Sequence, residues 1–358
     1  LSSNEIQQLL EGTSASNIKS IEVITSPPAK YEAEGGSVLN IITSKNIIAG
    51  YNGSIFGTYK QGSQFPKYAF GTSHFFKAKK LNTYLNYSIS PRKDFRNNDE
   101  FVNFIDNGQV TSSWETDFRR TRETSNQNIN ANIDYEFDEN NSLGFSTSML
   151  ISPRANTQNN VNSITDVFGS NKVLDSTFIT DNQKVDETIN LAFTLDYIHK
   201  FKKQGEKLLI SAHHTNYDFS SFQNVDTDYL FPDESLIRNN RFQTFSSQEV
   251  KLYTGQIDYE LPLSGSGSFE AGVKISNINS ISILSQYDFN NGTRALDLQN
   301  SDTFLYDETN YAVYSSYSKD WNKWSLKLGL RTELTDIKGN SISSNTINDT
   351  KYGKFFPS

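Results

Sequence analysis

Apolar and polar residues alternate along most of the chain after residue 50. From residue 129 to 137 the odd positions hold Ile, Ala, Ile, Tyr and Phe, and the even positions hold Asn, Asn, Asp and Glu. Successive side chains of a strand point to opposite faces of a sheet, so a period of two gives the strand one apolar and one polar face. The same split recurs at 143–149, 189–197, 253–261, 269–276 and 325–331. The pattern predicts an all-β protein.

About twelve strands are expected from these runs and the turn residues between them. They span 50–61, 66–76, 81–90, 122–137, 142–152, 185–201, 207–219, 242–261, 268–288, 309–319, 324–335 and a last one entered at 351. Several exceed the ~9–11 residues with which a strand crosses a bilayer. The segment 268–288 is the clearest case, and its excess predicts strands that project beyond a membrane as a collar.

The connections predict an antiparallel up-and-down barrel. Tight polar turns are expected at 77–80, 138–141, 202–206, 263–267 and 320–323, and longer links at 92–119, 153–184, 223–241 and 289–303. This strict alternation puts all tight turns at one end of the sheet, as in outer-membrane barrels with short periplasmic turns and long extracellular loops. A soluble β-sandwich gives the same apolar alternation and stays open on periodicity alone. Its Greek-key links, however, rarely produce this order.

Composition agrees with a barrel around a wet lumen. A hydrophobic share of 35% is low for a packed core, and an aromatic share of 13% is high for a disordered chain. A barrel reconciles both, since only every second residue must be apolar and aromatic residues collect at the membrane interfaces. No run approaches the ~18 apolar residues of a membrane helix. Aromatic residues near the tight turns are expected to form a periplasmic-side girdle, although β-propensity explains any single one equally well: Tyr135, Phe137, Phe201, Tyr259, Trp321 and Trp324.

The stretch from residue 17 to 45 differs from the rest of the chain. It reads NIKSIEVITSPPAKYEAEGGSVLNIITSK and holds two short apolar strand candidates, Ile21 to Ile24 and Val38 to Thr43, with a Pro-Pro break and a Gly-Gly turn between them. A short helix is expected ahead of it at 3–10, with Ser3 as the N-cap and Ile6, Leu9 and Leu10 on one face.

This stretch resembles the C-terminal end of the plug domain of TonB-dependent outer-membrane receptors, in the variant common in Bacteroidetes-type bacteria. It departs from the family pattern at Lys19, where glutamate is frequent, and at Ser26, where glycine is more frequent. The matching positions are Ile18, Ile21, Glu22, Val23, Ile24, Pro27, Pro28, Tyr31, Gly35, Gly36, Asn40, Ile41, Ile42 and Thr43.

The resemblance implies a two-part organisation and a location in the outer membrane of a Gram-negative cell. Residues 1–45 would be the C-terminal part of an α+β plug, and 50–358 the N-terminal part of a barrel embedded in outer-membrane lipid. Plugged transporters have 22 strands, so about twelve strands would be the first half, with the gene product continuing past Ser358. Because Leu1 begins in mid-pattern, we interpret the chain as a mature or truncated fragment.

The function that the resemblance implies is uptake of an extracellular ligand through the plugged barrel. Energy would come from a TonB-type protein that pulls on a segment N-terminal to the plug, and no enzyme activity is expected. The alternatives are a binding or adhesion barrel without uptake and an outer-membrane hydrolase. The predicted loops show no diagnostic aromatic or basic cluster, so the ligand and its binding residues stay unknown.

The sequence offers few residues for metal or cofactor chemistry. There is no cysteine, which removes disulfides and thiolate sites. The four histidines are His74, His199, His213 and His214, and the last two should point to opposite faces of their strand, so no metal site is predicted. Acidic groups at 288–291 or at Asp226, Asp228, Asp233 and Glu234 could hold calcium, but a solvated loop is the better interpretation.

Catalytic and nucleotide motifs are also weak. Ser211 and Ser220 lie near the paired histidines, but no nucleophile elbow surrounds them, and Ser264-Gly265-Ser266-Gly267-Ser268 falls in a predicted tight turn. Gly35-Gly36 opens onto a strand and not a helix, so no phosphate cradle or nucleotide cofactor is expected. The net charge of −8 argues against a nucleic-acid partner.

Overall fold

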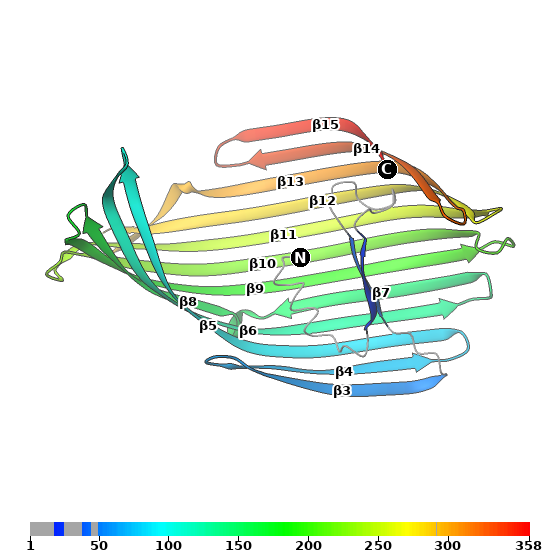
Figure 1. Cartoon of the computed structure of the whole chain (residues 1–358), viewed down its shortest axis with the longest axis horizontal. Helices are drawn as coiled ribbons and strands as arrows, with labels where there is room; N and C mark the ends of the chain where they lie inside the picture. The colour runs from blue at the N-terminus through cyan, green and yellow to red at the C-terminus, as the bar shows by residue number, and fades with distance from the viewer. Residues whose placement is uncertain (1–17, 25–37, 44–48, 291) are drawn as a thin grey trace.

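The computed structural model describes residues 18–24, 38–43, 49–290 and 292–358. These form a two-stranded sheet and a 13-stranded antiparallel sheet (Figure 1). The small sheet pairs β1 (Ile18–Ile24) with β2 (Val38–Thr43). The large sheet consists of β3 (Gly50–Gln61), β4 (Pro66–Lys77), β5 (Leu81–Asp106), β6 (Gln109–Glu136), β7 (Asn141–Ser152), β8 (Gln158–Gly169), β9 (Leu174–Lys200), β10 (Lys207–Leu230), β11 (Leu236–Leu263), β12 (Gly267–Asn290), β13 (Thr293–Asp320), β14 (Ser325–Ser341) and β15 (Thr346–Pro357).

The strands of the large sheet lie in chain order, from β3 at one edge to β15 at the other. β7 and β8 share one position, because both lie between β6 and β9: β7 pairs with residues 127–136 of β6, and β8 with residues 112–123. They are one strand interrupted at 153–157, where the chain makes a 3-10 turn (Arg154–Asn156). Thirteen strands at twelve positions confirm the predicted strand number. The expected total of 22 stays a prediction.

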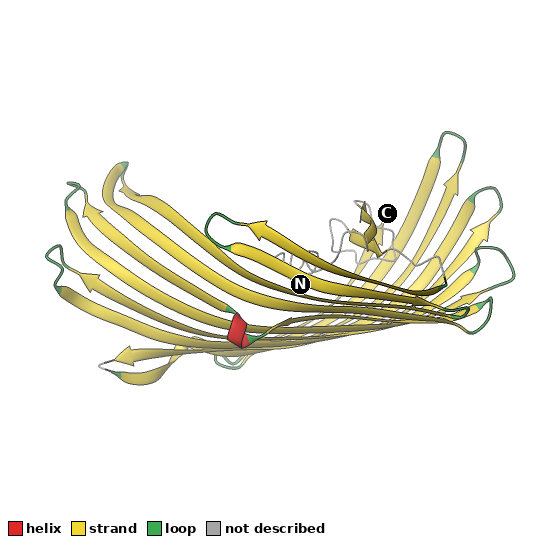
Figure 2. Cartoon of the chain, turned by 90° about the horizontal axis from the view of Figure 1, so that it is seen from below, coloured by secondary structure: helices red, strands yellow, loops and turns green. Residues whose placement is uncertain are grey.

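The sheet curves strongly, so it has a concave and a convex face (Figure 2). We call the end at which β3 begins the near rim, which is on the right in Figure 1, and the opposite end the far rim. Side chains converge on a concave surface and splay on a convex one. Accordingly, small polar side chains of one face are almost fully buried, among them Ser73, Asn86, Ser88, Asn126 and Asn128 at 0–1% exposure. Large apolar side chains of the other face are exposed, among them Leu85, Ile133, Leu195, Ile257 and Leu330.

The convex face carries an apolar band next to the near rim. On β9 the band runs over nine residues, 189–197, and ends at Glu187. Nine residues at about 3.3 Å each, tilted by about 40°, give a height of about 23 Å, close to the ~25 Å apolar band of outer-membrane barrels. On β5, β6, β10, β14 and β15 the band ends at Lys93, Glu123, Asp218, Asp336 and Lys351, respectively. The predicted division into lipid-facing and lumen-facing positions is confirmed.

The predicted long loops were wrong, because they are strands. β5, β6 and β9 to β13 are 24–28 residues long, and they close at the far rim in turns as short as those at the near rim. The clearest is the two-residue turn at Asn107 and Gly108, whose φ angles are 47° and 80°. Asn-Gly favours this turn because both residues accept positive φ. The projecting segments have water on both faces, so no apolar period marked them as strands.

Other expectations about the arrangement have mixed outcomes. The tight turns at the near rim are confirmed, and the large sheet is a single layer, so the soluble sandwich is excluded. The predicted girdle residues lie at the near rim, where Tyr135 packs edge-on against Phe137 at 5.2 Å between ring centroids. The predicted helix at 3–10 lies outside the described residues. β1 and β2 lie on the concave side of the large sheet (Figure 2).

Helices contribute little to the described part of the chain. No helix there is long and apolar enough to cross a membrane.

A charge placed in the apolar band tests the assignment of the two faces. Val273 lies on the convex face of β12, mid-band and 46% exposed. We expect Val273→Arg to lower the free energy of unfolding from lipid vesicles by about 2–4 kcal/mol, because the guanidinium would face hydrocarbon. The neighbouring Lys274→Arg change, on the concave face, should leave that free energy nearly unchanged. Urea titration of both variants, with equal losses as the contradicting result, checks the prediction.

The last turn of the far rim depends on Asp302. Its carboxylate accepts hydrogen bonds from the Ser343 N–H (3.0 Å) and from the Ser341 and Ser343 hydroxyls (2.7 and 2.8 Å), which lower the pKa of Asp302 to about 2. A depressed pKa gives stabilisation that is complete above the ordinary value near 4 and is lost as pH falls through about 2. We expect Ser343 amide exchange to stay protected at pH 5 and to accelerate near pH 2. Asp302→Asn should expose this amide already at pH 5, and equal protection in both proteins would contradict the assignment.

Candidate functional site

One register level of the concave face crosses four strands with interacting side chains. Asp258, Gly272, Tyr314 and Arg331 stand directly opposite one another on β11, β12, β13 and β14. The Tyr314 hydroxyl reaches over β12 and donates to Asp258 Oδ1 at 2.5 Å. A Cβ at position 272 would lie 2.6 Å from Tyr314 ring atoms, so glycine lets the ring lie flat on the sheet. Gln256 donates to both partners, at 2.8 Å to Asp258 and 2.9 Å to Tyr314.

A buried ion pair continues this network along β14. Arg331, only 1% exposed, donates from Nε to Glu333 Oε1 at 2.5 Å, and its guanidinium lies 5.4 Å from the Tyr314 ring centroid. Asn310 Nδ2 donates to the other Glu333 oxygen at 3.2 Å and to Thr335 Oγ1 at 2.8 Å. Buried charges are tolerated where they are paired and hydrogen-bonded. We call Gln256, Asp258, Asn310, Tyr314, Arg331 and Glu333 the wall network.

A pocket of about 460 Å³ opens on the concave face beside the wall network. Its lining includes the ammonium group of Lys274, the imidazole of His213 and the carboxylates of Glu308 and Glu333. This volume and the few convergent polar groups are typical of small-molecule sites. The remaining lining residues are Leu252, Thr254, Ser276, Ile278, Asn310, Thr335 and Tyr352.

A continuous row of aromatic rings crosses the concave face near the far rim. Trp114 on β6 packs against Phe104 on β5 at 5.0 Å and against Phe178 on β9 at 5.1 Å between ring centroids. Phe178 packs against Tyr229 on β10 at 5.5 Å, and the Arg238 guanidinium of β11 lies 4.0 Å from the centroid of that ring. Phe104 and Trp114 stay 42% and 36% exposed, so part of the row is free for contact.

The aromatic row corrects the expectation that no aromatic cluster marks this end of the protein. Its members are scattered between residues 104 and 238, and sequence alone does not place them together. Strand pairing does, because Phe178 stands opposite Tyr229, which stands opposite Arg238. No regular spacing of these aromatic residues marks the row in the sequence, and the sequence predicts loops in the segments that carry them.

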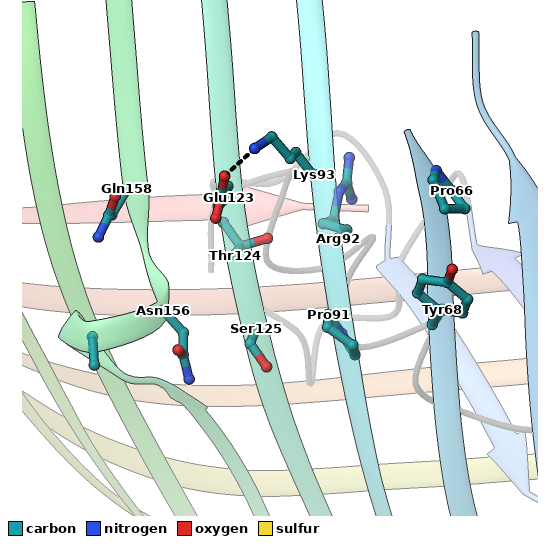
Figure 3. A pocket seen from close by; sticks show the side chains of 11 residues that line it. Pro66, Tyr68, Pro91, Arg92, Lys93, Glu123, Thr124, Ser125, Asn156 and Gln158 are labelled. Carbon is teal, nitrogen blue, oxygen red and sulfur yellow. Dashed lines mark hydrogen bonds and ion pairs between the residues drawn. The ribbon is translucent and has the colours of Figure 1, made fainter. Parts of the chain in front are cut away.

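A second hollow, of about 350 Å³, lies where β7 gives way to β8 (Figure 3). Lys93 of β5 reaches toward Glu123 of β6, and the two form an ion pair beside it. Tyr68, Lys93 and Glu123 belong to the convex face, at the edge of the apolar band. This hollow therefore opens mainly on the convex face, at the edge of the apolar band.

The four histidines are spread over the sheet. His213 contacts the Thr194 and Thr215 hydroxyls at 2.8 Å on the concave face, while His214 stacks on Tyr253 at 4.4 Å on the convex face, so the predicted opposition is confirmed. His74 contacts the Tyr51 hydroxyl at 2.6 Å, and His199 contacts Asn141 Oδ1 at 2.8 Å. Within the described residues no three His, Asp or Glu side chains gather as a metal site.

The residues considered for hydrolysis and calcium binding have other partners. Ser211 donates to Asp196 and not to His213. Residues 264–266 are the hairpin turn between β11 and β12, with positive φ at Gly265 and Ser266, and Gly267 and Ser268 begin β12. Asn239 Nδ2 donates to both Asp226 and Asp228, at 2.6 and 2.7 Å. The absence of an enzyme activity and of a metal stays a prediction.

These features define the class of the protein: it is an integral β-barrel protein of the outer membrane. The model of the outer membrane protein beta-barrel family matches residues 199–358. No curated protein sequence matches the chain. Among solved structures, the outer membrane protease OmpT from Escherichia coli is similar at 11% identity and a TM-score of 0.25, over 79% of this chain and 95% of that one.

The buried ion pair of the wall network gives a quantitative test. Arg331→Leu leaves Glu333, 8% exposed, without its cation, so we expect a loss of about 3–5 kcal/mol in the free energy of unfolding from lipid vesicles. The double change Arg331→Leu with Glu333→Leu removes both charges and should recover most of that loss. Urea titration checks this, and a double variant as unstable as the single one would contradict the pairing.

Proposed function

We propose that the protein is an outer-membrane receptor that takes up a ligand along its concave face. The observation that supports this proposal most is the wall network, because its buried charged side chains lie on the concave face, opposite the apolar band. Such a wall suits a water-filled passage, and a passage in a wide barrel must be occluded to prevent leakage. We assign that role to residues 1–45, and we propose a TonB-type protein as the partner that supplies energy.

The resemblance of residues 17–45 to the end of a plug supports this assignment. The position of β1 and β2 on the concave side of the sheet is compatible with it. We further propose that the protein binds and moves its ligand without changing covalent bonds, and that nucleic acid is not a partner.

A binding or adhesion barrel without uptake is the second candidate. The observation that favours it is the projection of β5, β6 and β9 to β13 far beyond the apolar band, which presents a large polar collar at the far rim. The two candidates differ in the fate of the ligand. Uptake carries it into the cell, whereas adhesion keeps it at the surface.

Depletion of solutes from the growth medium separates these functions. We expect host cells with the protein and a working TonB-type partner to remove at least one solute that cells lacking either component leave in the medium. Mass spectrometry of spent medium measures this loss for every detectable solute, so the ligand need not be identified beforehand. Surface retention that is independent of the TonB-type partner would favour adhesion, and it would contradict energised uptake.

Removal of the proposed plug is a second test of the same proposal. Deleting residues 1–45 within the full-length protein should open the passage, so that proteoliposomes swell faster in isotonic arabinose than those with the intact protein. Heat-dependent mobility on gels confirms that the shortened barrel is folded. Equal swelling rates of the two folded proteins would contradict a plugging role.

A further inference from the structure

The concave face of β3 to β6 collects positive charge where the apolar band ends. Lys60, Lys67 and Arg92 stand opposite one another in one cross-strand row. Two residues farther along β5 toward the far rim, Asp94 stands opposite Arg122. After two more residues, Arg96 stands opposite Arg120. We call these six cations the cationic patch. They contrast with a chain whose net charge is −8.

The carboxylates nearby do not neutralise the cationic patch. Asp94 is taken by Lys67 Nζ at 2.5 Å and by Arg92 Nε at 2.7 Å. Glu100 and Asp106 are the other acidic residues on this face of β5, three and six pleat positions beyond Asp94. The six cations therefore outnumber the three carboxylates on this face of β5. Like charges directly opposite on adjacent strands are destabilising, so Arg96 and Arg120 form an arrangement that the sheet itself does not favour.

Two arginines of the cationic patch are available to a ligand. Arg120 and Arg122 are half-buried and have no hydrogen-bond or ion-pair partner in the described part of the chain. Arg96 is exposed and donates only to Asn98 Oδ1, at 3.1 Å. An unpaired guanidinium presents several N–H donors in a planar fork that matches carboxylate and phosphate oxygens.

Next to these arginines, on the near-rim side of the same strand, lie buried polar groups that have no hydrogen-bond partner. The concave-face residues of β6 are Arg120, Arg122, Thr124 and Asn126 in succession. Thr124 and Asn126 are only 6% and 1% exposed, yet Thr124 Oγ1 and Asn126 Nδ2 have no hydrogen-bond partner. Buried polar groups are nearly always hydrogen-bonded. A column of free guanidinium, hydroxyl and amide groups thus lines one strand, and all of them can donate to an anion.

We propose that this column is an anion site in the passage and that the ligand taken up carries carboxylate or phosphate groups. The inference rests on the proposed uptake function, and it adds the chemical class of the ligand. The expectation that the predicted loops carry no basic cluster did not cover this patch, because four of its six cations lie outside the predicted loop 92–119. All six meet only through strand pairing. The aromatic row begins three pleat positions above Arg120, at Trp114 on the same strand, and would contact an apolar part of the same ligand.

Binding of defined anions to the purified protein in detergent micelles tests the site apart from transport. Citrate serves as the carboxylate probe and inorganic pyrophosphate as the phosphate probe, each titrated by calorimetry at low salt. We expect saturable binding of at least one probe, and the tighter of the two identifies the anion class. Arg120→Gln with Arg122→Gln should weaken it about tenfold or more, since charge-assisted hydrogen bonds are lost. Raising the salt to about 0.5 M should weaken it as well.

Arg119→Gln is the matched control. Arg119 neighbours Arg120 in the chain but lies on the convex face, where it pairs with Asp117 at 2.8 Å. Its loss should change the affinity by less than about twofold. If the double variant does not fold, the exposed Arg96→Gln variant replaces it, with an expected severalfold loss. No saturable binding of either probe, or equal loss in the Arg119 variant, overturns the anion site, while medium depletion decides uptake independently.

Discussion

The structure depends on the ladder of backbone hydrogen bonds that joins each strand to the next. In an apolar phase every N–H and C=O must find a partner within the protein, and a strand satisfies this only through its neighbours. Each strand from β4 to β14 is paired on both sides. The interruption between β7 and β8 falls at residues 153–157, level with the polar edge of the apolar band at Glu123 and Glu187. The ladder is therefore interrupted at a level where water can form hydrogen bonds with the backbone N–H and C=O groups that lack a strand partner.

The sheet that this ladder builds is a single layer, and it separates lipid on its convex face from the polar side chains of its concave face. Val273 faces lipid, and the next residue, Lys274, lines a pocket of the opposite face. Polar side chains on the concave face can then interact across several strands, as Tyr314 does with Asp258. The wall network, the aromatic row and the cationic patch are three products of this arrangement. Each takes one side chain from each of several strands at matching register.

Charge is distributed unevenly along the passage. The wall network on β11 to β14 holds two carboxylates, Asp258 and Glu333, and one guanidinium, that of Arg331, which donates to Glu333. The cationic patch on β3 to β6 leaves Arg120 and Arg122 unbalanced on the same face. Under the proposed uptake function, a ligand on the concave face would therefore meet one excess carboxylate on the side of β11 to β14 and free N–H donors on the side of β5 and β6. This asymmetry would orient an anionic ligand toward β5 and β6.

The sequence by itself determined the fold class, the two faces of each membrane strand and the turns of the near rim, because lipid on one side enforces a strict period of two. It determined neither the projecting strands nor the clusters on them. With water on both faces no period survives between 92 and 119, and only the Asn107-Gly108 turn marked the hairpin. The tertiary structure decided which distant residues meet, such as Trp114 with Phe178 and Arg96 with Arg120, because strand register is set by the pairing of whole strands.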